Sequence, residues 1–111
     1  MFRVVRAKGL VWLACKEGQA QQGFASLAGH DFALKLEAPW WAAVERSQWP
    51  DGVAERVEPV WHEPWGDRRT EFVIIGQRMD HAAVATALTA CLLTDAEMQE
   101  YLSLEKRGLL Q

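Results

Sequence analysis

Apolar and polar residues alternate along the start of the chain with a period of two, which is typical of β-strands that have two different faces. In residues 2–15, every second position from Val5 onward is apolar or small, whereas Arg6 and Lys8 fall on the opposite face. Gly9, in the middle of the segment, indicates a bulge or a close approach of a neighbouring backbone. The pattern therefore predicts a strand with one apolar face and one mixed face.

Two further strands are expected at residues 23–28 and 32–38, after a polar stretch at 16–22 that favours a turn. A tight turn that begins with glycine separates the two strands. The second strand alternates cleanly, and three of its side chains are expected to face inward: Phe32, Leu34 and Leu36. Residues 1–38 together predict a β-meander.

The middle of the chain, residues 39–69, is the least regular. It holds all four prolines and five of the six tryptophans. Pro39 is expected to start a short helix over 40–44, and Asp51 to cap another helix that runs to Val57. Tryptophans in such a segment usually fill the core or anchor loops, because their large rings bury well.

Residues 70–78 predict one more strand, built on the apolar run 72–75. A strand that is apolar on both faces is typical of the centre of a sheet, with cover on each side. The whole chain, 1–111, is then expected to form a single α+β domain. Its mostly antiparallel sheet has about four strands, and helices pack on that sheet.

The C-terminal helices are expected within residues 80–107. Asp80 is suited to cap the first helix, whose apolar stripe includes Cys91 and places that thiol in the core. Thr94 with Glu97 three residues later is a capping box that opens the second helix. Each helix therefore has its own start signal in the sequence.

Composition narrows the function classes. The chain has 111 residues, a net charge of −3, and 50% hydrophobic and 24% charged residues. This composition is typical of a globular domain. The slightly negative net charge does not favour binding to nucleic acid, and no apolar run in the sequence is long enough to span a membrane. Two cysteines without a Cys-x-x-Cys pair favour a reducing, cytoplasmic setting over a disulfide scaffold.

Motifs of self-contained catalysis are absent from the sequence. It has no phosphate-binding P-loop, no dinucleotide-binding glycine motif, no Gly-x-Ser-x-Gly and no His-Glu-x-x-His. None of the three serines lies beside a histidine. The chain is therefore not expected to be an enzyme by itself, and no catalytic residue is assigned.

Three histidines are the weak candidates for a metal site: His30, His62 and His81. Their spacing is not that of a known ligand set, and the favoured interpretation is three surface or turn histidines without a metal. The alternative is a weak zinc site, formed if they converge in the fold with Cys15 and nearby carboxylates. No cofactor other than zinc is suggested.

Two basic pairs and two tryptophans are the candidate interaction residues. Arg6 and Lys8 project from one strand face, and Arg68-Arg69 follow a Gly-Asp turn. Solvated charges paired with nearby carboxylates would explain them without a function. The functional interpretation is docking to an acidic partner or to a nucleotide phosphate held by another domain. Two tryptophans are the expected apolar companions: Trp12 and Trp65.

Four segments carry a further signal through their order and spacing: residues 6–14 (RAKGLVWLA), 40–44 (WWAAV), 65–76 (WGDRRTEFVIIG), and Met79-Asp80 leading into 90–97 (ACLLTDAE). Together they span most of the chain, and the ordered set resembles the C-terminal domain of the CobW family of metallochaperone GTPases. The resemblance implies an α+β domain that accompanies a GTPase domain and carries no hydrolytic chemistry itself. The family's P-loop and its Cys-x-Cys-Cys metal motif have no counterpart in these 111 residues.

The resemblance implies a function for the whole chain. We expect a noncatalytic interaction or regulatory domain of a metal-homeostasis system that handles zinc or cobalt, including the cobalt of cobalamin synthesis. Its implied partners are a GTPase domain in the same or another chain and a client metalloprotein. The family usually has a strand and a helix before this region, so an exposed sheet edge or face is expected, which a homo-oligomer would cover. The alternative is a stand-alone zinc-binding or metal-transfer protein.

Overall fold

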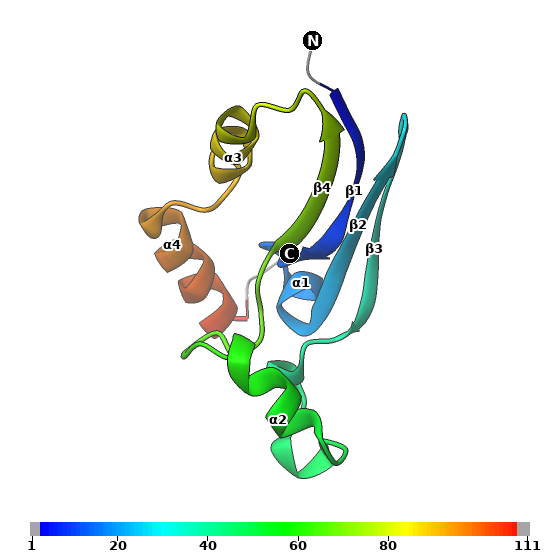
Figure 1. The fold of residues 1–111 in the computed structure, drawn as a ribbon. Coiled ribbons are helices and arrows are strands. Elements are labelled where there is room, and N and C mark those ends of the chain that lie inside the picture. Colours follow the sequence, from blue (N-terminus) through cyan, green and yellow to red (C-terminus); the bar gives the residue numbers. More distant parts are fainter. Residues whose placement is uncertain (1–2, 109–111) are drawn as a thin grey trace.

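A computed structural model describes residues 3–108. One four-stranded antiparallel sheet is combined with helices on one side and a tryptophan-rich segment at one end (Figure 1). The elements follow in this order: β1 (Arg3–Val11), α1 (Lys16–Ala20), β2 (Gln21–Ala28), β3 (Asp31–Pro39), η1 (Trp41–Ala43), η2 (Arg46–Gln48), α2 (Val53–Val57), η3 (Glu58–Val60), β4 (Glu71–Gln77), α3 (His81–Thr89) and α4 (Asp95–Lys106). The α+β fold class and the four antiparallel strands are confirmed.

The strand order is β3-β2-β1-β4, so β1 is hydrogen-bonded on both sides. Gly9 allows this, because a Cβ at this position would collide with the carbonyl oxygen of Glu71 in β4. The close backbone approach expected at Gly9 is confirmed, and the bulge lies nearby, between Val4 and Arg6. β1 and β2 are therefore the two inner strands of the sheet.

The expectation that residues 70–78 form a central strand is wrong, because β4 lies at the edge of the sheet. Burial alternates along β4: Phe72 and Ile74 are half-buried, whereas Val73 and Ile75 are exposed. The cover therefore lies on one face only. One apolar face of β4 packs inside the domain, and the other apolar face is exposed to solvent.

Two expected core assignments also fail. Phe32, Leu34 and Leu36 are exposed on β3, because this second edge strand has no helix over it. Cys91 is exposed too, since α3 ends at Thr89 and the thiol lies beyond the helix, in the link to α4. Apolar periodicity in these segments does not correspond to burial within this domain.

The polar stretch after β1 forms a helix, α1, instead of a turn. Cys15 is its N-cap, and the cysteine sulfur accepts a hydrogen bond from the backbone N–H of Gly18 at 3.3 Å. Gly18 is buried, and its carbonyl oxygen accepts a hydrogen bond from Nε1 of Trp40 at 2.9 Å. Trp40 has no exposed surface, so α1 and this indole form the centre of the core.

The tryptophan-rich segment is fastened by one buried carboxylate. Asp67 is 3% exposed, and its two oxygens accept hydrogen bonds from the backbone N–H groups of Trp41 and Ala42 at 3.0 and 2.9 Å. These bonds hold η1, the short helix expected after Pro39. The expected Asp51 cap is wrong, because Gly52, with φ of 89°, is the N-cap of α2 and makes no side-chain hydrogen bond.

The start signals of the C-terminal helices are confirmed. The Asp80 carboxylate accepts the backbone N–H of Ala83 at 3.0 Å, and Thr94 and Glu97 exchange both hydrogen bonds of the capping box. The bonds from Thr94 to the Glu97 carboxylate lower its pKa, because they stabilise the charged form. Within residues 3–108, no helix is long and apolar enough to cross a bilayer.

Candidate functional site

An open face of the sheet carries the first candidate pair, Arg6 and Lys8. In the register between β1 and β4, Arg6 is opposite Ile75 and Lys8 is opposite Val73. Paired residues on neighbouring strands point to the same side of a sheet, so these four side chains form one surface, here called the β1–β4 patch. Val73 is 61% exposed and Ile75 58%, and both cations are exposed. The patch thus joins positive charge to accessible apolar area.

The cations of the patch are free to bind a partner. Among the residues that the structure describes, the only salt bridge joins Arg69 and Glu71. Arg6 and Lys8 make none, and neither donates a side-chain hydrogen bond in the same part of the chain. An incoming carboxylate would therefore not compete with an internal ion pair.

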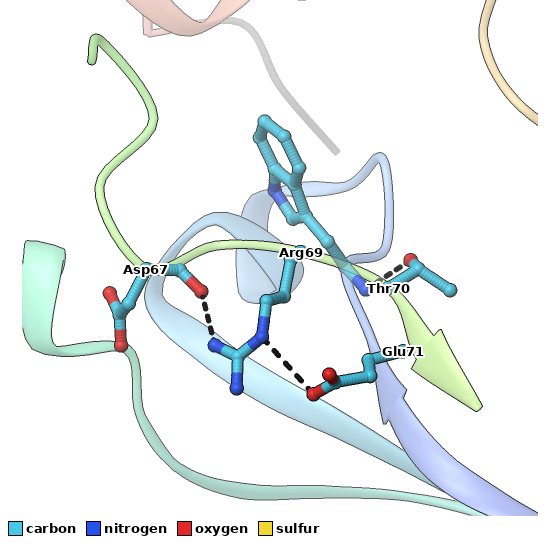
Figure 2. Close-up of polar contacts among 5 residues, drawn as sticks. Asp67, Arg69, Thr70 and Glu71 are labelled. Atoms are coloured by element: carbon cyan, nitrogen blue, oxygen red, sulfur yellow. Dashed lines mark hydrogen bonds and ion pairs between the residues drawn. The ribbon is translucent and has the colours of Figure 1, made fainter. Parts of the chain in front are cut away.

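The second candidate pair, Arg68 and Arg69, belongs to a different environment. Arg68 donates from Nε to the carbonyl oxygen of Gln19 at 2.8 Å and from Nη1 to that of Trp65 at 3.2 Å. Arg69 donates to the main-chain oxygen of Asp67 at 2.9 Å and to the Glu71 carboxylate at 3.3 Å (Figure 2). Both guanidinium groups therefore make hydrogen bonds that stabilise the segment before β4.

The candidate tryptophans lie against each other and not beside Arg6 and Lys8. The rings of Trp12 and Trp65 have centroids 5.5 Å apart at an interplanar angle of 52°. The backbone N–H of Trp12 donates to the Thr70 hydroxyl at 3.1 Å, whereas its indole nitrogen is buried without a hydrogen-bond partner in the described chain. The six candidates are therefore divided: Arg6 and Lys8 lie in the open patch, Trp12 and Trp65 pack against each other, and Arg68 and Arg69 make internal hydrogen bonds.

Charge removal at Arg68 should separate these roles. Replacing Arg68 by methionine, which keeps much of the apolar stem, is expected to lower the free energy of unfolding by about 2 kcal/mol, because two half-buried carbonyls lose a charged donor. The same change at Arg6 should cost less than about 0.5 kcal/mol, since Arg6 is exposed and makes no side-chain hydrogen bond. Urea unfolding followed by circular dichroism measures both. If the two variants lost the same free energy of unfolding, Arg68 would not be a structural cation and Arg6 a free one.

Next to Arg68 is a pocket of about 370 Å³, lined by Lys16, Gln19, Ala20, Ala43, Arg68, Glu105 and Gly108. Tyr101 of α4 lies close by and donates to the side-chain oxygen of Gln19 at 2.7 Å. Burial, and then the charge of Glu105, raise the pKa of Tyr101, so the neutral donor is favoured. The pocket wall contains two cations, Lys16 and Arg68, and one anion, Glu105.

The histidines do not converge. His30 is in the turn between β2 and β3, His62 pairs with Gly66 in an isolated bridge, and His81 opens α3. Across residues 3–108, no group of three or more His, Cys, Asp or Glu side chains is placed to hold a metal ion. The geometry gives no support to the stand-alone zinc site.

A second aromatic cluster was not foreseen from the sequence. The guanidinium carbon of Arg46 lies 4.8 Å from the ring centroid of Trp49 and 5.0 Å from that of Trp61. The two rings are 5.7 Å apart in an edge-on arrangement, and Trp41 packs against Trp49. Cation–π contacts of this kind stabilise the exposed end of the segment. The only signal in the sequence for these contacts is the high density of tryptophans in this segment.

The sequence matches the family described as the cobalamin synthesis protein cobW C-terminal domain over residues 2–92. The chain belongs to the cobW C-terminal domain family. The match covers all four strands and α3, so the β1–β4 patch, the Asp67 carboxylate and the Arg68 network all lie within the cobW domain. Helix α4 follows the matched region.

Two of the curated relatives of this cobW domain have names that mention zinc. A zinc-regulated GTPase metalloprotein activator 1 of Dictyostelium discoideum is 34% identical over 97 residues, and a zinc chaperone of Mycobacterium tuberculosis is 32% identical over 98. Each alignment covers 86% of this chain but 20% and 24% of the relative. The chain thus spans about a fifth to a quarter of the relatives' length. No solved structure matches it.

Proposed function

We propose that the chain is a noncatalytic interaction domain of a CobW-type metal-homeostasis system and that it docks on a GTPase domain, in the same chain or in a separate one. The observation that carries the proposal is the β1–β4 patch on a cobW C-terminal domain. Sheet residues that are apolar and exposed beside free cations are typical of a surface that another protein covers. The relatives, which are four to five times longer than the aligned segment, supply the expectation of a GTPase partner.

The chemistry of the patch defines its partner. Arg6 and Lys8 call for carboxylates. Val73 and Ile75 are two positions apart on β4, so they call for apolar side chains about 7 Å apart along the strand. A partner surface that combines acidic and apolar residues, such as an amphipathic acidic helix, meets both requirements. Charge would guide the encounter, and burial of the two β-branched side chains would supply most of the affinity.

The system's cargo is a metal ion handled by the partner. The names of the relatives favour zinc, and the family description is the reason for keeping a link to cobalamin synthesis. A client metalloprotein, self-association and a regulatory effect on the GTPase complete the proposal. The free thiols of Cys15 and Cys91 are consistent with a location in the reducing cytoplasm. Because the sequence has no P-loop, the chain alone is expected not to hydrolyse GTP.

Binding of the purified 111-residue chain to the CobW-type GTPase domain from the same source tests the proposal. Arg6→Glu combined with Lys8→Glu is expected to weaken binding at least tenfold, because both carboxylate contacts become repulsive. Val73→Ser combined with Ile75→Ser should weaken it by a similar factor. Arg56→Glu is the matched control, since Arg56 is an exposed cation in the last turn of α2, away from the patch. Isothermal titration calorimetry measures all three.

Three results would contradict the proposal. They are binding that the patch variants leave unchanged, no binding in the presence of GTP, GDP or zinc, and saturable GTP hydrolysis by the purified chain. An immunoblot of the source cells decides the arrangement of the partners. A band near 12.5 kDa means a separate GTPase chain, and a band larger by a GTPase domain means that the two domains are fused.

A further inference from the structure

In the part of the chain that the structure describes, the outer edge of β3 pairs with no other strand. β3 is the terminal strand of the sheet, and Figure 1 shows no other element beyond it. Phe32 is 66% exposed, Leu34 45% and Leu36 42%, all on one face. A long apolar edge strand is a template for pairing with another strand unless a proline, a bulge, an unmatched charge or a cover blocks it. Here Pro39 and the register shift between Gln21 and Gly23 come only at the far end.

The hairpin determines which backbone groups of β3 are free. Ala28 and Asp31 pair directly across a two-residue turn, and such flanking residues exchange both hydrogen bonds. Counting by two from Asp31, Ala33 and Lys35 also bond to β2. The backbone N–H and C=O groups of the residues between them therefore point outward: Phe32, Leu34 and Leu36.

The charges of β3 are self-complementary. Asp31 and Lys35 lie on the same face, two positions on either side of Ala33. If two antiparallel copies of β3 are related by a two-fold axis through Ala33, Asp31 of each copy is opposite Lys35 of the other. Phe32 and Leu34 are then opposite each other on the second face, in hydrogen-bonded positions. This arrangement forms two Asp31–Lys35 ion pairs, two Phe32–Leu34 pairs and four backbone hydrogen bonds.

The three registers with an axis further along β3 are less favourable. An axis through Leu34 places Asp31 opposite Glu37, and an axis through Lys35 places two lysines opposite each other, both like-charge pairs. An axis through Leu36 would place Ala33 opposite Pro39, which has no N–H and lies beyond the register shift. The Ala33 axis uses only the regular part of the strand.

We infer that β3 pairs with β3 of a second copy of this chain through a two-fold axis at Ala33, which joins two sheets into one of eight strands. An interface of this kind, the same on both copies, is the commonest in soluble oligomers. The inference gives the self-association proposed above a surface and a register. It is independent of docking on a GTPase domain, because the β1–β4 patch lies on other strands, and either can fail alone.

Site-specific crosslinking tests the register. In a Cys15→Ser, Cys91→Ser background, in which a hydroxyl at position 15 can still cap α1, Ala33→Cys should form a disulfide-linked dimer under mild oxidation. Directly opposed residues at this type of position have Cα atoms about 4.5 Å apart, within disulfide range. Lys35→Cys should stay monomeric on a non-reducing gel, since its two copies would be roughly 14 Å apart. The reverse pattern, or no crosslink in either variant, would overturn the inference.

A charge exchange tests the pairing without cysteines. Analytical ultracentrifugation of the full chain should show a dimer that Asp31→Lys alone weakens about tenfold, because two attractive pairs become repulsive. Lys35→Asp alone should have the same effect, and the double variant should return to within about threefold of the starting affinity. A monomer at every concentration up to about 1 mM, or singles that the double variant does not rescue, would refute the self-pairing of β3.

Discussion

Replacing Asp67 by alanine is expected to lower the free energy of unfolding by about 3–5 kcal/mol. The carboxylate is buried and accepts two backbone hydrogen bonds, from Trp41 and Ala42, and bonds to a charged acceptor are among the stronger ones. Without it, both N–H groups of η1 lose their acceptor inside the protein. Urea unfolding followed by far-ultraviolet circular dichroism measures the loss.

Two further variants make the Asp67 result specific. Asp67→Asn keeps one acceptor oxygen and should lose about half as much, because its amide group cannot accept the second bond. Asp51→Ala is the control: Asp51 is exposed and has no side-chain hydrogen bond within residues 3–108, so the change should stay below about 0.5 kcal/mol. A loss at Asp67 no larger than at Asp51 would mean that η1 is held by something else.

Truncation of Trp40 is expected to have an effect of similar size. Trp40→Ala should cost about 4 kcal/mol, because it removes the largest fully buried side chain and leaves a cavity. Trp40→Phe restores most of the ring but loses the hydrogen bond to the Gly18 carbonyl, and should cost about 1–3 kcal/mol. A small domain has about 5–15 kcal/mol in total, so the alanine variant should lose a large fraction of its stability and melt at a clearly lower temperature.

The neighbouring tryptophan provides the control for Trp40. Trp41 is half-buried and packs edge-on against Trp49, so Trp41→Phe should cost less than about 1 kcal/mol. Thermal melts followed by circular dichroism compare the variants, because fluorescence from the other tryptophans would obscure the signal. If Trp41→Phe destabilises the protein more than Trp40→Phe does, the assignment of Trp40 to the centre of the core is wrong.

Local signals in the sequence located most of the elements. The capping box at Thr94 and Glu97 and the alternation of β1 were sufficient, because helix caps and strand periods depend on near neighbours. The place of β4 in the sheet was not predictable in this way. An apolar run looks the same in a central strand and in an edge strand whose second face is exposed, and only pairing with β1 distinguishes them.

The candidate site was predictable only in part. The side of the strand that carries Arg6 and Lys8 followed from alternation, but their apolar neighbours Val73 and Ile75 required the register with β4. Arg68 appeared equivalent to Arg6 in sequence. Its carbonyl partner Gln19 is 49 positions away, and no spacing rule reaches so far. Long-range hydrogen bonds therefore decided which cations are free and which are structural.

The short helix α1 has a consequence for where the chain tolerates changes in length. Three distant parts bond to it: Trp40 to Gly18, Arg68 to the Gln19 carbonyl, and Tyr101 to the Gln19 side chain. An inserted or deleted residue in α1 would rotate these groups by about 100° and misalign all three at once. A Cβ added at Gly29 or at Gly52 would have no atom within 4 Å, and within residues 3–108 neither turn bonds to three distant segments as α1 does. Insertions, tags and fusion points therefore belong in those turns and not between β1 and β2.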